Sequence, residues 1–198
     1  MTGTAARRAP KQPEPSADQA LIASCLNGDH EAWARLIDKY KNLIYSIPVK
    51  LGIHQDASDI FQSVCVDLLA ELPKLREHRA LPKWLMQTCY HRCLHHRRMA
   101  GRNVELDTDA VDDGRVIGRG LSLPEEMLVQ LEREQALRDA IAQLPSRCER
   151  MIQMLFFSVP PLPYDAVAKE LRLATGSIGF IRGRCLTRLK NYLEKKGF

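Results

Sequence analysis

Apolar side chains recur at every third or fourth position through the first hundred residues, the spacing that places them on one face of an α-helix. This pattern predicts a short helix over about 18–26 and a longer helix over 29–48 that is bent near its proline. It predicts a third helix over about 56–72 and, after a polar loop, a fourth from about 84 to 98. We expect these four helices to form one unit.

Polar residues at the ends of these runs predict where the helices begin and stop. Asp18 and Asp29 precede the first two runs, where a side-chain oxygen can accept bonds from the first free backbone N–H groups. Asn27 and Gly28 supply the stop between them. On the third helix we expect one apolar side made of Ile60, Phe61, Val64, Cys65, Leu68, Leu69 and Leu72.

Helical spacing is lost from about residue 100 to 126, where glycines and acidic residues dominate. It resumes over 128–144, continues after Pro145, and is broken again by the prolines of 160–163. Two further helices are predicted over 164–172 and from 177 to about 195.

The predicted fold is all-α, with two helical domains and no sustained β-alternation. Residues 1–17 are expected to be a disordered tail, because they are rich in Pro and Ala and poor in apolar side chains. Residues 18–100 form the first domain, 101–127 a flexible acidic linker, and 128–198 the second domain.

The last two predicted helices have the pattern of a helix-turn-helix. A short turn that contains Gly176 joins them, and the small Ala168 lets the second helix cross the first closely. The side chains expected to pack between them are Val167, Leu171, Ile178 and Ile181. Helix pairs of this kind also occur as ordinary hairpins with a solvated basic face, so the pattern alone leaves both interpretations open.

The distribution of charge favours the DNA-binding interpretation over the ordinary hairpin. The chain carries a net charge of +5, but from residue 165 onward eight bases face three acids, whereas residues 104–135 hold nine acids and three bases. A basic end beside an acidic connector is typical of a protein with a polyanionic partner. Since Arg pairs bidentately with guanine edges, the basic second helix favours DNA reading.

Other features exclude some classes of protein. Residues 1–17 lack the apolar segment of a signal peptide, and no apolar stretch approaches the ~18 residues needed to span a membrane. The six cysteines are irregularly spaced, so we expect free thiols in a reducing cytoplasm.

Several short motifs, in order along residues 18–198, resemble the extracytoplasmic-function (ECF) branch of the sigma-70 family of RNA polymerase subunits. In the first domain, 27–33 (NGDHEAW) is similar to the family's GD-x-x-AF, and 56–62 (DASDIFQ) to its A-x-D-x-x-Q. Lys83, Trp84 and Leu85, followed by Arg97 and Arg98, are similar to its WL…RR.

The second domain continues the resemblance. Residues 142–147 (AQLPSR) look like the family's LP-x-R, and 167–171 (VAKEL) like its IA-x-x-L. Residues 176–179 and 182–186 occupy the place of its GTV-x-SR…RA, although Gly179 and Gly183 replace larger side chains. The resemblance implies a sigma factor with no catalytic residue, no cofactor and no metal.

The resemblance also implies the role of particular residues. Asp59 and Gln62 would contact the β′ clamp of core RNA polymerase, from one face of the third helix. The set implied at the −10 element of the promoter is Lys83, Trp84, His91, Arg92, Arg97 and Arg98. The set implied at the −35 element is Ser177, Arg182, Arg184, Arg188 and Lys190.

The partners that follow are the β′ clamp and β subunits of core polymerase, promoter DNA and, in this family, an anti-sigma factor. His91 stands where the family often has Asn, and Trp84 can equally belong to the core.

Two other interpretations use the same residues. A free-standing helix-turn-helix regulator would account for the second domain, but such proteins dimerise over two half-sites and the chain has no evident dimer seam. A metal-binding enzyme would use Cys89, Cys93 and His96, which share one helical face, but a fourth ligand is lacking.

Overall fold

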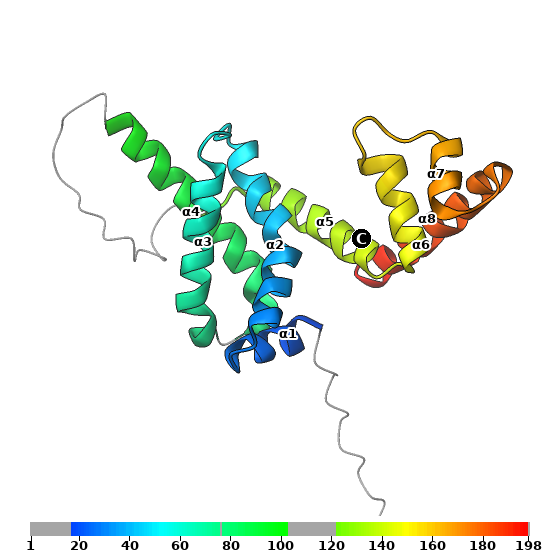
Figure 1. Ribbon diagram of the computed structural model, residues 1–198. Coiled ribbons are helices and arrows are strands. Elements are labelled where there is room, and N and C mark those ends of the chain that lie inside the picture. The colour runs from blue at the N-terminus through cyan, green and yellow to red at the C-terminus, as the bar shows by residue number, and fades with distance from the viewer. Residues whose placement is uncertain (1–16, 76, 103–121, 198) are drawn as a thin grey trace, which may run out of the picture. The chain divides into compact units, whose positions relative to one another are not determined.

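The computed structural model describes residues 17–75, 77–102 and 122–197, and every regular element in those ranges is helical, which confirms the all-α prediction (Figure 1). The chain divides into two compact units, one up to Leu123 and one from Pro124 onward. All of the predicted N-terminal tail except Ala17, which begins the first helix, and most of the predicted acidic linker lie outside the described residues.

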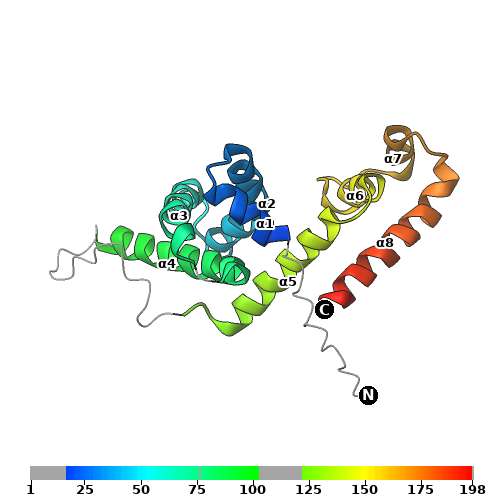
Figure 2. The same cartoon turned by 90° about the horizontal axis from the view of Figure 1, so that it is seen from below.

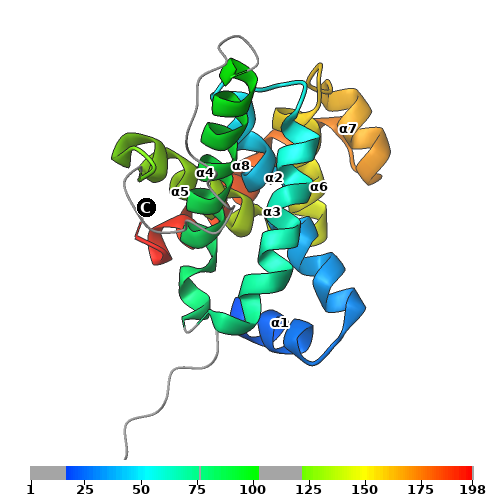
Figure 3. The same cartoon turned by 90° about the vertical axis from the view of Figure 1, so that its left-hand side faces the viewer.

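The first unit contains four α-helices. These are α1 (Ala17–Leu26), α2 (His30–Lys50), α3 (Ala57–Glu71) and α4 (Leu81–Arg102). Helices α2, α3 and α4 each pack against the other two, and α1 packs against α2, as Figure 3 shows from the side of α3 and α4. The shared core is aliphatic, with fully buried Leu36, Leu43, Ile47, Val64, Leu68, Leu85 and Met86.

The start of α2 follows from its capping residue, as predicted. Asp29 Oδ1 accepts bonds from the backbone N–H groups of Glu31 (2.9 Å) and Ala32 (3.1 Å). The preceding Gly28 has a φ of +86°, which a side chain would strain, so the turn between α1 and α2 needs glycine.

The prediction that Asp18 caps the first helix is wrong. Asp18 lies inside the first turn of α1, where its carboxylate accepts a bond from the Tyr40 hydroxyl at 3.0 Å and also pairs with Lys39. The residue therefore ties α1 to α2, a role that its position in the sequence does not reveal.

The fourth helix begins earlier than the spacing predicts, at Leu81 rather than Trp84. Two short 3₁₀ turns, η1 (Leu72–Lys74) and η2 (His78–Ala80), precede it. Because Leu81 is fully buried, core packing fixes the start of α4 one turn before the tryptophan.

The second unit is built around its last helix. Its elements are α5 (Glu125–Ala142), α6 (Ser146–Ile152), the π-helical turn η3 (Gln153–Phe157), α7 (Tyr164–Leu171), η4 (Thr175–Ser177) and α8 (Ile178–Lys195). Helix α8 packs against α5, α6 and α7, and Figure 2 shows it as a long straight helix that follows the short α7. The predicted inward side chains Val167, Ala168, Leu171 and Ile178 are all buried.

Two of the six cysteines are joined, so the prediction of free thiols is wrong for this pair. Cys148 of α6 and Cys185 of α8 form a disulfide between positions 37 residues apart. Both are buried where α6 meets α8, a pairing that sequence spacing alone does not give. The other four cysteines, Cys25, Cys65, Cys89 and Cys93, are free thiols.

Candidate nucleic-acid interface

Helix α8 is fixed along one side and open along the other. Arg172 ends α7 in the left-handed conformation, with a φ of +54°, and the chain then turns into α8. Ile178 and Cys185 are fully buried against the rest of the unit. The opposite side of α8 is therefore presented to solvent in a fixed orientation.

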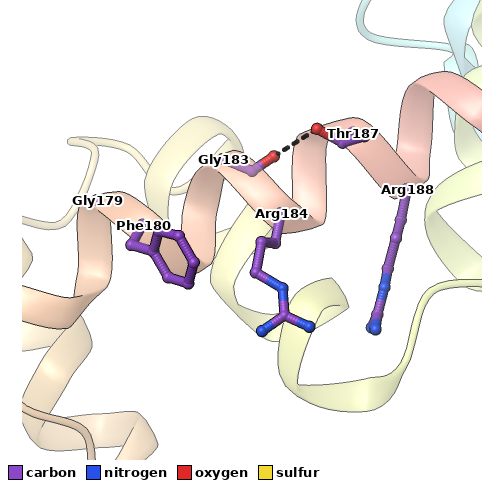
Figure 4. A pocket seen from close by; sticks show the side chains of 6 residues that line it. All are labelled: Gly179, Phe180, Gly183, Arg184, Thr187 and Arg188. Atoms are coloured by element: carbon purple, nitrogen blue, oxygen red, sulfur yellow. Dashed lines mark hydrogen bonds between the residues drawn. The ribbon is translucent and has the colours of Figure 1, made fainter.

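Six exposed residues make up that opposite side, which we call the α8 face: Gly179, Phe180, Gly183, Arg184, Thr187 and Arg188. Figure 4 shows the side chains of Phe180, Arg184 and Arg188 projecting on the same side of the helix. The guanidinium carbon of Arg184 lies 5.9 Å from the centroid of the Phe180 ring, a cation–π distance. The α8 face thus combines an apolar ring with two cations and contains no carboxylate.

Phe180 is the residue of this face that is absent from the predicted −35 set. Its side chain is 72% exposed although it is large and apolar. A signal was present in the sequence, because Phe180 precedes Arg184 by four residues and so lies one turn away on the same side of a helix.

The predicted −35 residues fall into two groups. Arg184, Arg188 and Lys190 are exposed, and Lys190 Nζ lies 3.6 Å from Glu194. Arg182 is half-buried and places its guanidinium carbon 5.7 Å from the ring centroid of Tyr164 in α7. Ser177 is half-buried in the turn η4, just before α8. Arg182 therefore contacts its own unit rather than contributing to the α8 face.

The two glycines of the α8 face are not required by packing. A Cβ atom built on Gly179 or on Gly183 would meet nothing within 4 Å. Thr187 Oγ1 donates a bond of 3.0 Å to the carbonyl of Gly183 (Figure 4). The glycines leave bare backbone beside Phe180 and Arg184.

A second open face runs along α4 in the first unit. Lys83 and Arg98 are exposed, and Trp84 and His91 are half-buried. Their spacings of seven and fourteen or fifteen residues put these four side chains, which we call the α4 face, on one side of the helix. The buried Leu85, Cys89 and Cys93 occupy the other side.

The remaining predicted −10 residues are bound within the first unit. Arg92 donates from Nε to Asp67 Oδ2 at 2.7 Å and from a terminal nitrogen to the other oxygen, so it bridges α4 and α3. Hydrogen bonding to Asp67 raises the pKa of Arg92 above its usual value. Arg97 donates to the carbonyl of Leu51.

The end of the connection between the units packs on the same side of α4 as the α4 face. The backbone N–H of Leu123 donates to Gln87 Oε1 at 3.2 Å, and the Leu123 side chain is only 4% exposed. Gln87 lies one turn from both Lys83 and His91.

The predicted polymerase-binding pair lies on the exposed side of α3. Asp59 and Gln62 are both exposed, and two apolar residues extend the same side, Val66 (64% exposed) and Leu69 (57%). The prediction that Leu69 belongs to the buried side of this helix is wrong. We call these four residues the α3 stripe.

A groove of about 470 Å³ borders the α3 stripe. It lies between α2 and α3 and is lined by apolar residues of both, among them Trp33, Ile37, Cys65 and Leu69. An exposed apolar stripe beside a groove is typical of a surface that binds another protein.

The residues of the metal hypothesis do not converge on a site. Cys89 donates its S–H to the carbonyl of Ile44 at 3.3 Å, and His96 Nε2 lies 3.4 Å from Asp56 Oδ2. Hydrogen bonding to Cys93 and burial raise the pKa of the Cys89 thiol. Among the described residues no three His, Cys, Asp or Glu side chains are grouped as metal ligands.

Within the same described ranges, no helix combines the length and the apolar character needed to cross a bilayer.

No family model matches the chain. A solved structure of CnrH in complex with the cytosolic domain of CnrY matches 91% of this chain and 99% of that chain, at 17% identity and a TM-score of 0.37. The chain is 22% identical over 164 residues to the ECF RNA polymerase sigma factor SigW of Bacillus subtilis, which covers 79% of this chain and 86% of that protein.

It is 23% identical over 185 residues to the ECF RNA polymerase sigma-E factor of Haemophilus influenzae, which covers 90% of this chain and 94% of that protein. The similarity to these two relatives extends through both units and supports, in general terms, a role as an RNA polymerase sigma factor.

Proposed function

We propose that this chain is a sigma factor of the ECF type, which binds core RNA polymerase and directs initiation by contacting the −35 and −10 elements of promoters. The observation that carries the proposal is the α8 face. Helix α8 is held on one side by α5, α6, α7 and a disulfide, and on its other side Arg184 and Arg188 are exposed. The chain has no role of its own as an enzyme in this proposal.

The second unit would read the −35 element. In a helix-turn-helix the second helix enters the major groove and contacts base edges with its N-terminal part, which here is the α8 face. Arg184 is placed to pair with a guanine edge, whereas Arg188 and Lys190 lie further along and suit phosphate.

The first unit would hold the −10 element on the α4 face. Capture of an unstacked base needs an aromatic support with cations nearby. Trp84 supplies the ring, and Lys83 and Arg98 supply exposed cations on the same side of the helix. Arg92 and Arg97 would keep the helix in place through Asp67 and Leu51 instead of binding DNA.

The α3 stripe would bind the polymerase, with the β′ clamp as the partner that the family resemblance implies. Apolar side chains surrounded by polar ones are what a protein–protein contact requires, and the stripe places Val66 and Leu69 beside Asp59 and Gln62.

The test is assembly with core polymerase. Purified chain should co-elute with core RNA polymerase and start transcription from its promoter, without added metal or cofactor. The double variant Asp59→Arg/Gln62→Ala should weaken this binding by at least tenfold, because it puts a cation and a truncated side chain in the contact.

The matched control is Glu132→Arg, which makes the same charge reversal at an exposed position of α5. Undiminished affinity of the double variant for core polymerase would refute the assignment of the α3 stripe. Failure of the unaltered chain to bind core polymerase at all would refute the proposed function.

A further inference from the structure

The α8 face places an apolar ring and a guanidinium one helical turn apart. Phe180 is exposed over 72% of its surface, and the Arg184 guanidinium carbon lies 5.9 Å from the centre of its ring. Neither side chain contributes to the core of the unit, since both are exposed and lie on the side of α8 opposite the buried Ile178 and Cys185. Phe180 and Arg184 therefore form an exposed surface that offers an apolar ring and a hydrogen-bond donor side by side.

Duplex DNA offers partners for both chemistries at the floor of the major groove. The C5-methyl group of thymine is the apolar group that side chains such as Phe contact, and the O6 and N7 atoms of guanine accept a bidentate Arg. Bare backbone at Gly179 and Gly183 allows α8 to approach the bases closely, because no side chain stands between the helix and the groove there.

The distance between Phe180 and Arg184 along α8 determines how far apart the two contacted base pairs can be. Residues four apart on a helix are separated by ~6 Å along its axis, whereas base pairs are ~3.4 Å apart on each strand. The two contacts therefore fall on neighbouring base pairs or with one pair between them.

We infer that Phe180 and Arg184 act together as one reading unit, in which Phe180 contacts the methyl group of a thymine and Arg184 the edge of a guanine within two base pairs of it. The inference rests on the proposed function, since it names the sequence feature that the α8 face would select. It adds Phe180 as a specificity-determining residue.

The experiment uses holoenzyme assembled from the full chain and core polymerase. Duplexes are first selected from a library randomised over the −35 region, and each thymine of the selected site is then replaced by 2′-deoxyuridine, which removes only the methyl group. One thymine should show a loss of affinity of about fourfold, the value expected for one buried methyl group.

The variant Phe180→Ala should bind the thymine and deoxyuridine duplexes equally. Phe157→Ala is the matched control, because Phe157 is also an exposed phenylalanine of this unit, at 53%, and lies outside the α8 face. It should retain the fourfold difference. In parallel, 7-deazaguanine at the neighbouring guanine should weaken binding of the unaltered chain but not of Arg184→Ala.

Three outcomes are distinguishable. If no thymine is sensitive to loss of its methyl group, or if the sensitivity persists in Phe180→Ala, the inference is overturned while the proposed function stands. If the holoenzyme selects no duplex at all, both are overturned. A sensitivity that disappears in Phe180→Ala and persists in Phe157→Ala establishes the contact.

Discussion

Helices α4 and α8 both carry arginines, but they hold them differently. On α4, Arg92 is bound by both oxygens of Asp67 and Arg97 by the Leu51 carbonyl. On α8, Arg184 faces only the ring of Phe180, and no ion pair joins Arg188 to another described residue. An arginine in a basic helix is thus either bound within its own unit or left exposed, according to what the neighbouring helix presents to it.

The two units also stabilise these helices by different means. In the first unit, α4 packs against two long helices over a broad aliphatic core. In the second unit, α8 packs against α5 and the two short helices α6 and α7, and the disulfide from Cys148 to Cys185 adds a covalent tie. Covalent tethering matters most in small units, because their cores bury little apolar surface.

The largest effect is expected from breaking that tie. Cys148→Ser with Cys185→Ser, or reduction of the unaltered chain, should destabilise the second unit by about 4 kcal/mol, the value expected from chain entropy for a closed loop of this length. The first unit should be unaffected. Hydrogen exchange of the full chain, followed separately in α2–α4 and in α6–α8, measures the two free energies of unfolding.

Cys65→Ser is the control, because Cys65 is a free, half-buried thiol of the first unit. Equal loss of protection in both units on reduction would show that the disulfide is not the feature that distinguishes them.

The next largest effect is expected at the ion pair of the first unit. Asp67→Ala should reduce the stability of that unit by about 2–3 kcal/mol, because it removes two charge-assisted hydrogen bonds and leaves a half-buried guanidinium without its partner. Arg98→Ala should leave stability unchanged and reduce promoter opening. Chemical denaturation and a permanganate footprint of the opened promoter separate the two results.

If Asp67→Ala impaired promoter opening without lowering stability, Arg92 would have to be a DNA contact after all, as the family resemblance first implied.

A smaller effect, now on base preference, is expected on the α8 face. Arg184→Ala should cost about 1–3 kcal/mol on the preferred −35 site and relax the preference at one base pair. Arg188→Ala should weaken binding to all sequences alike and lower the salt dependence by about one unit of slope. Binding to a panel of single-base −35 variants at two salt concentrations distinguishes these patterns.

A uniform loss in Arg184→Ala, with base preference unchanged, would place Arg184 among the phosphate contacts.

Much of the fold was predictable because helical spacing and capping are local. The Asp29 cap and the burial of Ala168 follow from a few neighbouring residues, and the structure confirms both. The exposure of Leu69 was not predictable in this way. Leu68 and Leu69 are ~100° apart around the helix, so only one of them can face the core squarely, and the spacing does not tell which.

The pairings between distant segments were not predictable from one sequence. The disulfide joins residues 37 apart, and Arg92 finds Asp67 on another helix. The disulfide depends on how α6 packs against α8, and the ion pair depends on how α3 packs against α4. Such packing is tertiary structure, which local sequence patterns do not determine. For the same reason the sequence predicts Arg182 beside Arg184 on a DNA-reading surface, whereas packing turns Arg182 toward Tyr164.

The smallest expected effect distinguishes the glycines of the α8 face from ordinary helical glycines. Alanine at Gly183 meets no atom within 4 Å, so Gly183→Ala should stabilise the second unit by about 1 kcal/mol through helix propensity alone. If the bare backbone serves close approach to the major groove, the same change should lower affinity for the preferred −35 duplex, because the added methyl group meets the bases. Stability and affinity would then change in opposite directions, which is rare for a surface substitution.

Thermal unfolding and duplex binding of this single variant measure both quantities. Gly101→Ala, at an equally open position near the end of α4, is the control that should leave −35 affinity unchanged. Increased stability with undiminished affinity would mean that Gly183 has no role in DNA binding.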